Sequence, residues 1–125
     1  MTDYIQIVTT TAGEAEAAAI AETLVQERLA ACVQVIGPVA STYWWQGKIE
    51  TSREWQCWIK SSRDLYDQVE QAIRRLHSYE VPEILAIPIL SASAAYLAWL
   101  DGEVGTARGK GEGGGRKGEG GGRKG

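Results

Sequence analysis

The chain has 125 residues, of which 44% are hydrophobic and 23% charged, a composition typical of one soluble domain. Residues 1–104 carry seven basic and 14 acidic side chains, a net charge of −7, which argues against a nucleic-acid-binding surface and favours cations as partners. No apolar run approaches the roughly 20 residues of a membrane span, and the first residues lack the pattern of a signal peptide. We therefore expect a cytoplasmic protein without a membrane segment.

A domain of about 100 residues buries roughly two thirds of the surface that its unfolded chain exposes. No metal or disulfide is therefore required for folding. The two cysteines, Cys32 and Cys57, have no Cys-x-x-Cys spacing, and in a reducing compartment they are expected to be free thiols.

The first half of the domain begins with a predicted strand at residues 4–10, which are dense in β-branched side chains. Residues 11–14 have the Thr-x-x-Glu form of a capping box, and the Ala-rich and Leu-rich stretch after them predicts a helix to about residue 29. A second strand is predicted at residues 31–36, and Gly37-Pro38 is expected to end it.

Two aromatic and β-branched runs, residues 39–46 and 48–60, are separated near Gly47 and predict a long hairpin. The hairpin holds four of the five tryptophans in a chain without phenylalanine. Large aromatic side chains left on a sheet mark an oligomer interface more often than a ligand platform. Stacking of nucleic-acid bases on these rings would need a basic groove, and none is predicted.

The second half begins with the clearest amphipathic pattern of the chain, at residues 65–76, where Ser61 or Ser62 is expected to cap the helix. Residues 83–90 predict a strand that Pro88 confines to a sheet edge or a bulge, and residues 91–100 predict a short last helix. The order β-α-β-β-α-β followed by a helix is typical of an α+β, ferredoxin-like split βαβ sandwich.

Residues 105–125 differ from the rest, because they hold 11 of the 15 glycines and six basic but only two acidic side chains. They include two copies of Gly-Glu-Gly-Gly-Gly-Arg-Lys and cannot build a core. We expect a flexible charged tail, of natural or engineered origin. The alternative, a basic arm for RNA, lacks aromatic residues and true Arg-Gly-Gly repeats. The predicted domain is therefore residues 1–104.

Four segments of the chain resemble the CutA divalent-cation tolerance family. They are Glu-Arg-Leu-Ala-Ala-Cys-Val at 27–33, Tyr-Trp-Trp-Gln-Gly-Lys-Ile-Glu at 43–50, His-Ser-Tyr-Glu-Val-Pro-Glu-Ile at 77–84 and Tyr-Leu-Ala-Trp-Leu at 96–100. The resemblance runs from about residue 4 to about residue 102. It departs at Ser78, where the family commonly has proline, and the tail has no counterpart.

The resemblance implies a ferredoxin-like subunit in a tight homotrimer, with the long hairpin reaching across to its neighbours. It also implies tolerance to copper and other divalent metals, binding of Cu(II), and a trimer similar to that of PII-type signalling proteins. Trp44, Trp45 and Trp58 are the residues that we expect at the trimer interface.

A metal site, for Cu(II) or another divalent cation, is predicted at His77 with Cys32 and Glu80. Imidazole suits copper and zinc, a thiol is a soft ligand, and a carboxylate could complete or orient the site. The alternative for His77 is a helix-end residue that interacts only with backbone carbonyl groups, and for Cys32 it is a small buried strand residue. The sequence has no string of ligands typical of a copper chaperone.

A second candidate site is an intersubunit cleft with Lys60, Tyr79 and Glu80, which could take a small anionic or zwitterionic ligand. The alternative is a surface salt bridge. No catalytic motif is present, so an enzyme is not expected. Three hypotheses follow: a trimeric cation-binding protein, a PII-like trimeric sensor of a small metabolite, or a trimeric scaffold.

Overall fold

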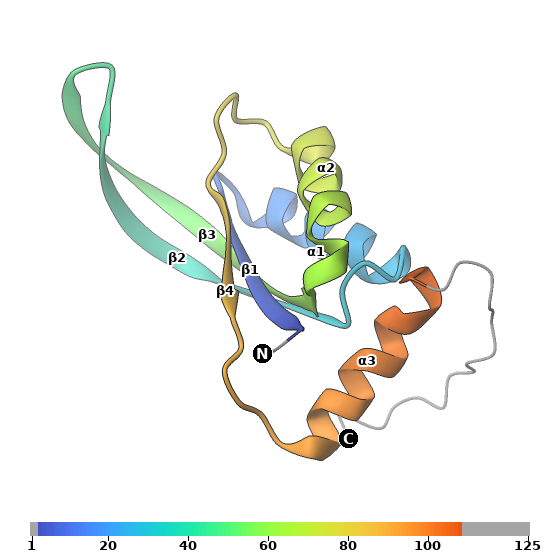
Figure 1. The fold of residues 1–125 in the computed structure, drawn as a ribbon. Helices are drawn as coiled ribbons and strands as arrows, with labels where there is room; N and C mark the ends of the chain where they lie inside the picture. The colour runs from blue at the N-terminus through green and yellow to red at the C-terminus, as the bar shows by residue number, and fades with distance from the viewer. Residues whose placement is uncertain (1–2, 109–125) are drawn as a thin grey trace.

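A computed structural model describes residues 3–108 of the chain, with side chains through residue 104, and places four strands and three α-helices (Figure 1). The strands form one antiparallel sheet in the order β2-β3-β1-β4. This order and the helices between the strands confirm the ferredoxin-like prediction. The elements are β1 (Tyr4–Thr11), α1 (Glu14–Gln26), β2 (Cys32–Trp45), β3 (Lys48–Ser62), a 3₁₀ turn (Arg63–Leu65), α2 (Tyr66–Leu76), β4 (Ile84–Pro88) and α3 (Ala94–Arg108).

The core lies between the sheet and the helices α1 and α2, which cover one face of it (Figure 1). Ile7 of β1 and Ile59 of β3 are register partners, and both are fully buried. The amphipathic pattern of the second helix is confirmed, because its apolar positions enter the same core. The buried helix residues are Ala17, Ile20 and Leu24 of α1 and Val69, Ala72 and Ile73 of α2.

The second strand does not end at Gly37-Pro38, as the sequence predicted. β2 continues to Trp45, and the two residues form an irregularity between Ile36 and Val39 in its pairing with β3. A proline lacks the N–H that a sheet ladder needs, and a bulge is the place where a paired strand accommodates it. The reversal near Gly47 is confirmed: Gln46 and Gly47 have φ of 50° and 81°, as the turn of a two-residue hairpin requires.

Beyond Thr11, which lies opposite Trp55, β3 has no partner in β1. Residues 39–54 therefore pair only with one another and project from the body as a two-stranded ribbon, here called the hairpin arm (Figure 1). Most of its side chains are exposed. The sheet consequently has two parts, a four-stranded base covered by helices and a bare arm.

The predicted capping box at the start of α1 is wrong. Thr11 is the last residue of β1, and its hydroxyl donates to the carbonyl of Gly13 over 2.8 Å. Gly13 occupies the N-cap position without a side-chain bond. The predicted caps of α2 are also absent, because Ser61 donates to the Leu29 carbonyl and Ser62 to the Asp64 carboxylate.

The last helix is longer than predicted and begins later. α3 starts at Ala94, passes residue 100 and continues to Arg108, with Leu100 and Val104 fully buried. The expected domain boundary at residue 104 therefore falls within this helix, residues 105–108 of the expected tail belong to α3, and residues 109–125 lie outside the described residues. In the part of the chain that the structure describes, no helix has the length and apolar character needed to cross a bilayer.

Candidate functional site

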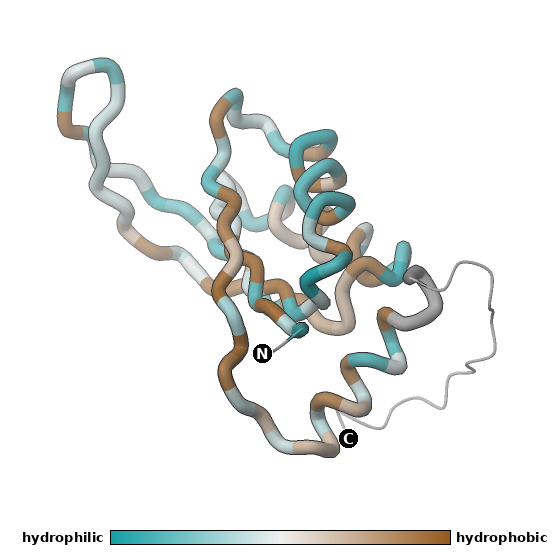
Figure 2. The backbone as a smooth tube through the Cα atoms, viewed as in Figure 1, coloured by the Kyte–Doolittle hydropathy of each residue, from teal (hydrophilic) through white to brown (hydrophobic). Residues whose placement is uncertain are grey.

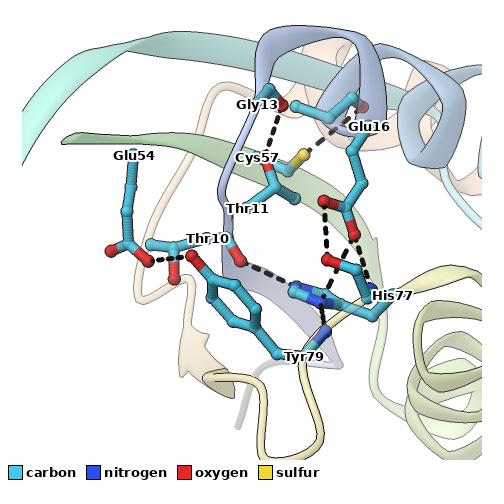
Figure 3. Close-up of polar contacts among 10 residues, drawn as sticks. Thr10, Thr11, Gly13, Glu16, Glu54, Cys57, His77 and Tyr79 are labelled. Carbon is cyan, nitrogen blue, oxygen red and sulfur yellow. Dashed lines mark hydrogen bonds and ion pairs between the residues drawn. The ribbon is translucent and has the colours of Figure 1, made fainter. Parts of the chain in front are cut away.

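The only histidine of the chain lies at the end of α2, in the cluster of polar contacts drawn in Figure 3. The His77 side chain is fully buried. Its Nε2 lies 2.7 Å from the carbonyl oxygen of Thr10, and its Nδ1 lies 3.1 Å from the backbone nitrogen of Tyr79. A carbonyl can only accept and a backbone N–H can only donate. The imidazole is therefore neutral, with its proton on Nε2.

Glu16, in the first turn of α1, lies on the other side of this ring. Its carboxylate accepts hydrogen bonds from the backbone N–H and the hydroxyl of Ser78, at 2.7 and 3.1 Å. One of its oxygens lies 3.5 Å from His77 Nδ1 (Figure 3). The carboxylate thus ties the residue after the histidine to α1.

Tyr79 connects the same cluster to the hairpin arm. Its ring packs on the His77 ring with centroids 4.9 Å apart, and its hydroxyl donates to Glu54 over 2.8 Å. Glu54 is buried and is the first arm residue after the β1 pairing ends. Burial and then the bond to Glu54 raise the pKa of the Tyr79 phenol well above its usual range.

The structure does not bring together the predicted metal ligands His77, Cys32 and Glu80. Both ring nitrogens of His77 are already in hydrogen bonds, so neither has a lone pair for a metal. Thr10, whose carbonyl His77 contacts, and Ile36 of β2 are both register partners of the same β3 residue. Ile36 lies four residues from Cys32 along β2, so Cys32 is displaced from the level of His77 by about 13 Å along the strand. Among residues 3–104, no three His, Cys, Asp or Glu side chains form a metal-binding group. This structure therefore does not fit a metal held by His77.

The predicted cleft residues also lie apart in one chain. Lys60 donates to the amide oxygen of Gln34 over 2.6 Å. Tyr79 instead bonds Glu54, which is six residues away from Lys60 along β3, a span of about 20 Å. Glu80 is exposed in the loop between α2 and β4. A cleft with these three residues would need more than one copy of the chain.

The contacts that sequence reasoning missed are those of Glu16, Glu54 and Thr10. Glu54 offered a faint signal, since it is an acid within a run of aromatic and β-branched residues. Thr10 contributes only its backbone carbonyl, and no residue type marks such a contact. Both cysteines are free thiols, with Cys57 buried and Cys32 partly buried.

Exposed apolar side chains gather in two places. One, here called the arm patch, is the set Tyr43, Trp44, Trp45 and Ile49 near the end of the hairpin arm. Trp44, which is 71% exposed, and its partner Ile49 lie on one face of the arm, and Tyr43 and Trp45 lie on the other. The other, here called the β4 patch, is Val81, Leu85, Ile87 and Leu90, and brown stretches follow β4 and the chain after it in Figure 2. Trp58 is also partly exposed, and both it and Leu85 pair with Val8 of β1.

The family model described as CutA1 divalent ion tolerance protein matches residues 5–103. The chain belongs to this family. The match covers all four strands, the His77 cluster and most of α3, so the family resemblance of the sequence is confirmed. The family's name describes tolerance of divalent ions and not a reaction.

Relatives from distant organisms support the assignment. The divalent-cation tolerance protein CutA of Thermus thermophilus is 37% identical over 94 residues, which are 75% of this chain and 91% of the relative. The chloroplastic protein CutA 1 of Oryza sativa is 38% identical over 81 residues, or 65% of this chain. The match spans only 46% of the rice protein, so the chain corresponds to about half of that relative.

Solved structures have the same fold. CutA from Xylella fastidiosa superposes with a TM-score of 0.80 at 38% identity and covers 82% of this chain and 99% of its own. CutA from Archaeoglobus fulgidus, described as a periplasmic divalent cation tolerance protein, gives a TM-score of 0.79 at 36% identity. The superposition covers 81% of this chain and 98% of that one.

Proposed function

We propose that this protein binds divalent cations, copper among them, as a homotrimer and without catalysing a reaction. Membership of the divalent ion tolerance family, over residues 5–103, carries the proposal. The net charge of −7 over residues 1–104 supports it, because an acidic surface attracts cations.

The two apolar patches support the homotrimer. Exposed apolar surface of this kind marks interaction sites, and the arm patch lies on a ribbon that reaches away from its own body (Figure 1). A twofold dimer buries the same patch of both subunits, whereas a head-to-tail contact joins two different patches and forms a ring when the rotation between subunits closes. Two separate patches on one chain favour the second arrangement. We place Trp44 and Trp45 of one subunit against a neighbour, together with Trp58.

The cation ligands proposed here are Cys32 and Glu80, each contributed by more than one subunit. Cys32 is partly buried near the start of β2, and Glu80 is exposed on its loop. A thiol and a carboxylate differ in softness, so Cu(I) and Cu(II) would depend on them to different extents. His77 is not among these ligands, since its ring nitrogens are hydrogen-bonded to the carbonyl of Thr10 and the backbone N–H of Tyr79.

The test is a calorimetric titration of Cu(II), Zn(II) and Mg(II) into the full chain, with mass measured by light scattering. We expect a particle of three chains that binds copper saturably. Copper at 100 times its Kd should then stabilise the fold by about 2.7 kcal/mol. Cys32→Ser and Glu80→Gln should weaken binding, and Cys57→Ser is the matched control because that thiol is buried. A trimer that binds none of the three ions would overturn cation binding and leave a scaffold or a metabolite sensor.

We also propose that the protein works in the cytoplasm. Its two cysteines are unpaired in the structure, which suits a compartment where thiols stay reduced. The Archaeoglobus fulgidus relative is described as periplasmic, so the two compartments are the alternatives to separate. Cell fractionation with a marker for each compartment tests the proposal, and recovery with the periplasmic marker would overturn it.

A further inference from the structure

An unbroken series of contacts runs from α1 through His77 to the base of the hairpin arm (Figure 3). Glu16 of α1 holds Ser78 and lies 3.5 Å from the His77 ring. The ring accepts the Tyr79 N–H, and the Tyr79 hydroxyl holds Glu54. Consecutive contacts in this series share a residue. A change at the His77 ring can therefore be transmitted through Tyr79 to Glu54 at the base of the arm.

The neutral ring has room for one further proton, on Nδ1. Nε2 already carries the proton that it donates to Thr10 over 2.7 Å. If Nδ1 gains a proton, two donors face each other across the 3.1 Å that separates Nδ1 from the Tyr79 nitrogen. That hydrogen bond is then lost.

The new Nδ1 proton has an acceptor close by. The Glu16 carboxylate is 3.5 Å from Nδ1, slightly beyond hydrogen-bond length, so a small movement of the ring toward α1 makes a charge-assisted bond. The positive imidazole and the negative carboxylate then form a buried pair. The Tyr79 backbone, without its acceptor, moves away from the ring.

Movement of Tyr79 acts on the arm through its hydroxyl. The bond to Glu54 is 2.8 Å long, and Glu54 is only 7% exposed. A buried carboxylate that loses its donor is destabilised until it reaches water. Because Glu54 begins the unpaired arm, its movement toward water shifts the base of the arm.

We infer that His77 is a proton-operated switch, which exchanges the Tyr79 N–H for the Glu16 carboxylate at Nδ1 and thereby releases the Tyr79–Glu54 bond that tethers the hairpin arm. A hydronium ion of the solvent gives the proton that forms the new N–H bond at Nδ1 and leaves as water, and every other change is an exchange of hydrogen bonds. Every contact lies within one chain, so the switch does not depend on the proposed trimer or on cation binding.

The titratable groups along this series of contacts are Glu16 and Tyr79 beside the ring, Glu54 and the Tyr43 phenol near Tyr79, and the Cys57 thiol near Glu16. Burial raises the pKa of Cys57 to about 11, and the phenol pKa of Tyr79 lies above its usual range. Neither therefore exchanges a proton near neutrality.

The first experiment observes the ring itself, in protein labelled with ¹⁵N at its single histidine. Above the midpoint of its titration, the imidazole nitrogen shifts should be those of the Nε2–H tautomer. Below it, both nitrogens should be protonated. An Nδ1–H tautomer in the neutral form would overturn the inference, because Nδ1 could then not accept the Tyr79 N–H.

The second experiment observes the arm through the indole N–H signal of Trp55, the neighbour of Glu54, assigned with Trp55→Phe. We expect this signal to move with the same midpoint as His77. Tyr79→Phe should abolish the movement while the histidine still titrates. Tyr66→Phe is the matched control, because it removes a hydroxyl that also bonds a carboxylate, that of Glu70, within α2.

A third variant, Glu16→Gln, removes the charge that accepts the new proton. We expect the midpoint of both signals to fall to lower pH together. A Trp55 movement that persists in Tyr79→Phe, or a histidine titration without any Trp55 movement in the unaltered chain, would refute the switch. Either result would leave cation binding and assembly untouched, since those are measured separately.

Discussion

Trp55 of β3 lies so close to Gly37 of β2 that a Cβ at Gly37 would stand only 2.7 Å from Trp55 Cγ. The indole thus occupies the space of a missing side chain at the irregularity where β2 passes Gly37-Pro38. Trp55 also packs against the main core. The contact therefore joins the irregular part of β2 to the covered base of the sheet.

Gly37→Ala should destabilise the protein by about 1 to 3 kcal/mol, as expected when an atom is forced into a packed site. The clash involves the inner carbon of the indole, which cannot move without shifting the β3 backbone or the rotamer of Trp55. Thermal unfolding at one fixed protein concentration measures the effect, because association changes the apparent stability.

Gly102→Ala is the control for this substitution. Gly102 lies inside α3, and a Cβ there would meet no atom within 4 Å. Alanine is favoured over glycine in a helix by about 1 kcal/mol, so this variant should be more stable than the parent chain. Equal losses in the two variants would show that the Gly37 contact has no special role.

The sequence predicted the number and type of the main elements well, because they follow from periodicity. Residues 65–76 repeat apolar side chains at helical spacing, and these enter the core as expected. The errors occurred where tertiary contacts override local signals. Gly37-Pro38 reads as a strand end, yet its long-range packing on Trp55 keeps β2 continuous. The last helix is predicted to end at residue 100, yet α3 continues to Arg108 and buries Val104.

Arg28 provides a second prediction, because it occupies a backbone conformation that usually belongs to glycine. Its φ is 60°, and the hydrogen bonds of Leu29 to Leu24 and of Arg28 to Val25 form a Schellman ending of α1. The guanidinium also pairs with Glu103 of α3 at 2.7 Å. The side chain therefore compensates for a strained backbone.

Arg28→Ala should destabilise the fold more than Arg28→Gly. Alanine loses the ion pair, worth up to about 1 kcal/mol at a half-exposed site, and keeps the strain. Glycine loses the same pair but relieves about 1 kcal/mol of left-handed strain. Denaturant unfolding of the three proteins should find the glycine variant close to the parent and the alanine variant the least stable, and an alanine variant more stable than the glycine variant would contradict this account of the turn.

The two cysteines should differ sharply in reactivity. Burial, and then the nearby Glu16 carboxylate, raise the pKa of Cys57 to about 11, and its Sγ lies 3.6 Å from the Ala17 carbonyl. Because the thiolate is the reactive form, iodoacetamide at pH 8 should modify Cys32 and spare Cys57 in the folded protein. Peptide mass spectrometry distinguishes them, and the denatured chain, in which both should react, is the control.

The same raised pKa predicts a loss of stability in alkali. Between pH 9 and 11 the unfolded thiol gives up its proton while the folded thiol keeps it, so the unfolded state is favoured progressively as the pH rises. The stability that the buried, protonated thiol contributes is fully present below pH 9 and is lost as the pH rises toward 11. Cys57→Ala should flatten the fall of unfolding free energy from pH 9 to 10, and an unchanged slope would contradict the assignment to Cys57.

The candidate site was harder to predict than the fold. The sequence offers two alternatives for His77, a metal ligand and a helix-end residue that interacts only with backbone carbonyl groups, and the fully buried ring matches neither completely. The partners of the ring are a carbonyl from residue 10 and a backbone N–H from residue 79. Backbone groups are common to every residue, so their use leaves no trace in the choice of amino acids.

The last prediction concerns Trp45, which is 45% exposed in the arm patch. If the arm patch lies against a neighbouring subunit, Trp45→Ala should weaken assembly by a few kcal/mol, as truncation of a buried aromatic anchor does at an interface. Sedimentation velocity over a dilution series measures the change as dissociation at higher protein concentration. Val25→Ala is the control, because Val25 is similarly exposed, at 42%, but lies on α1 outside both patches. An unaltered chain that sediments as a monomer at micromolar concentration would contradict the proposed trimer. Equal weakening by Trp45→Ala and Val25→Ala would show that the arm patch is not the site of assembly.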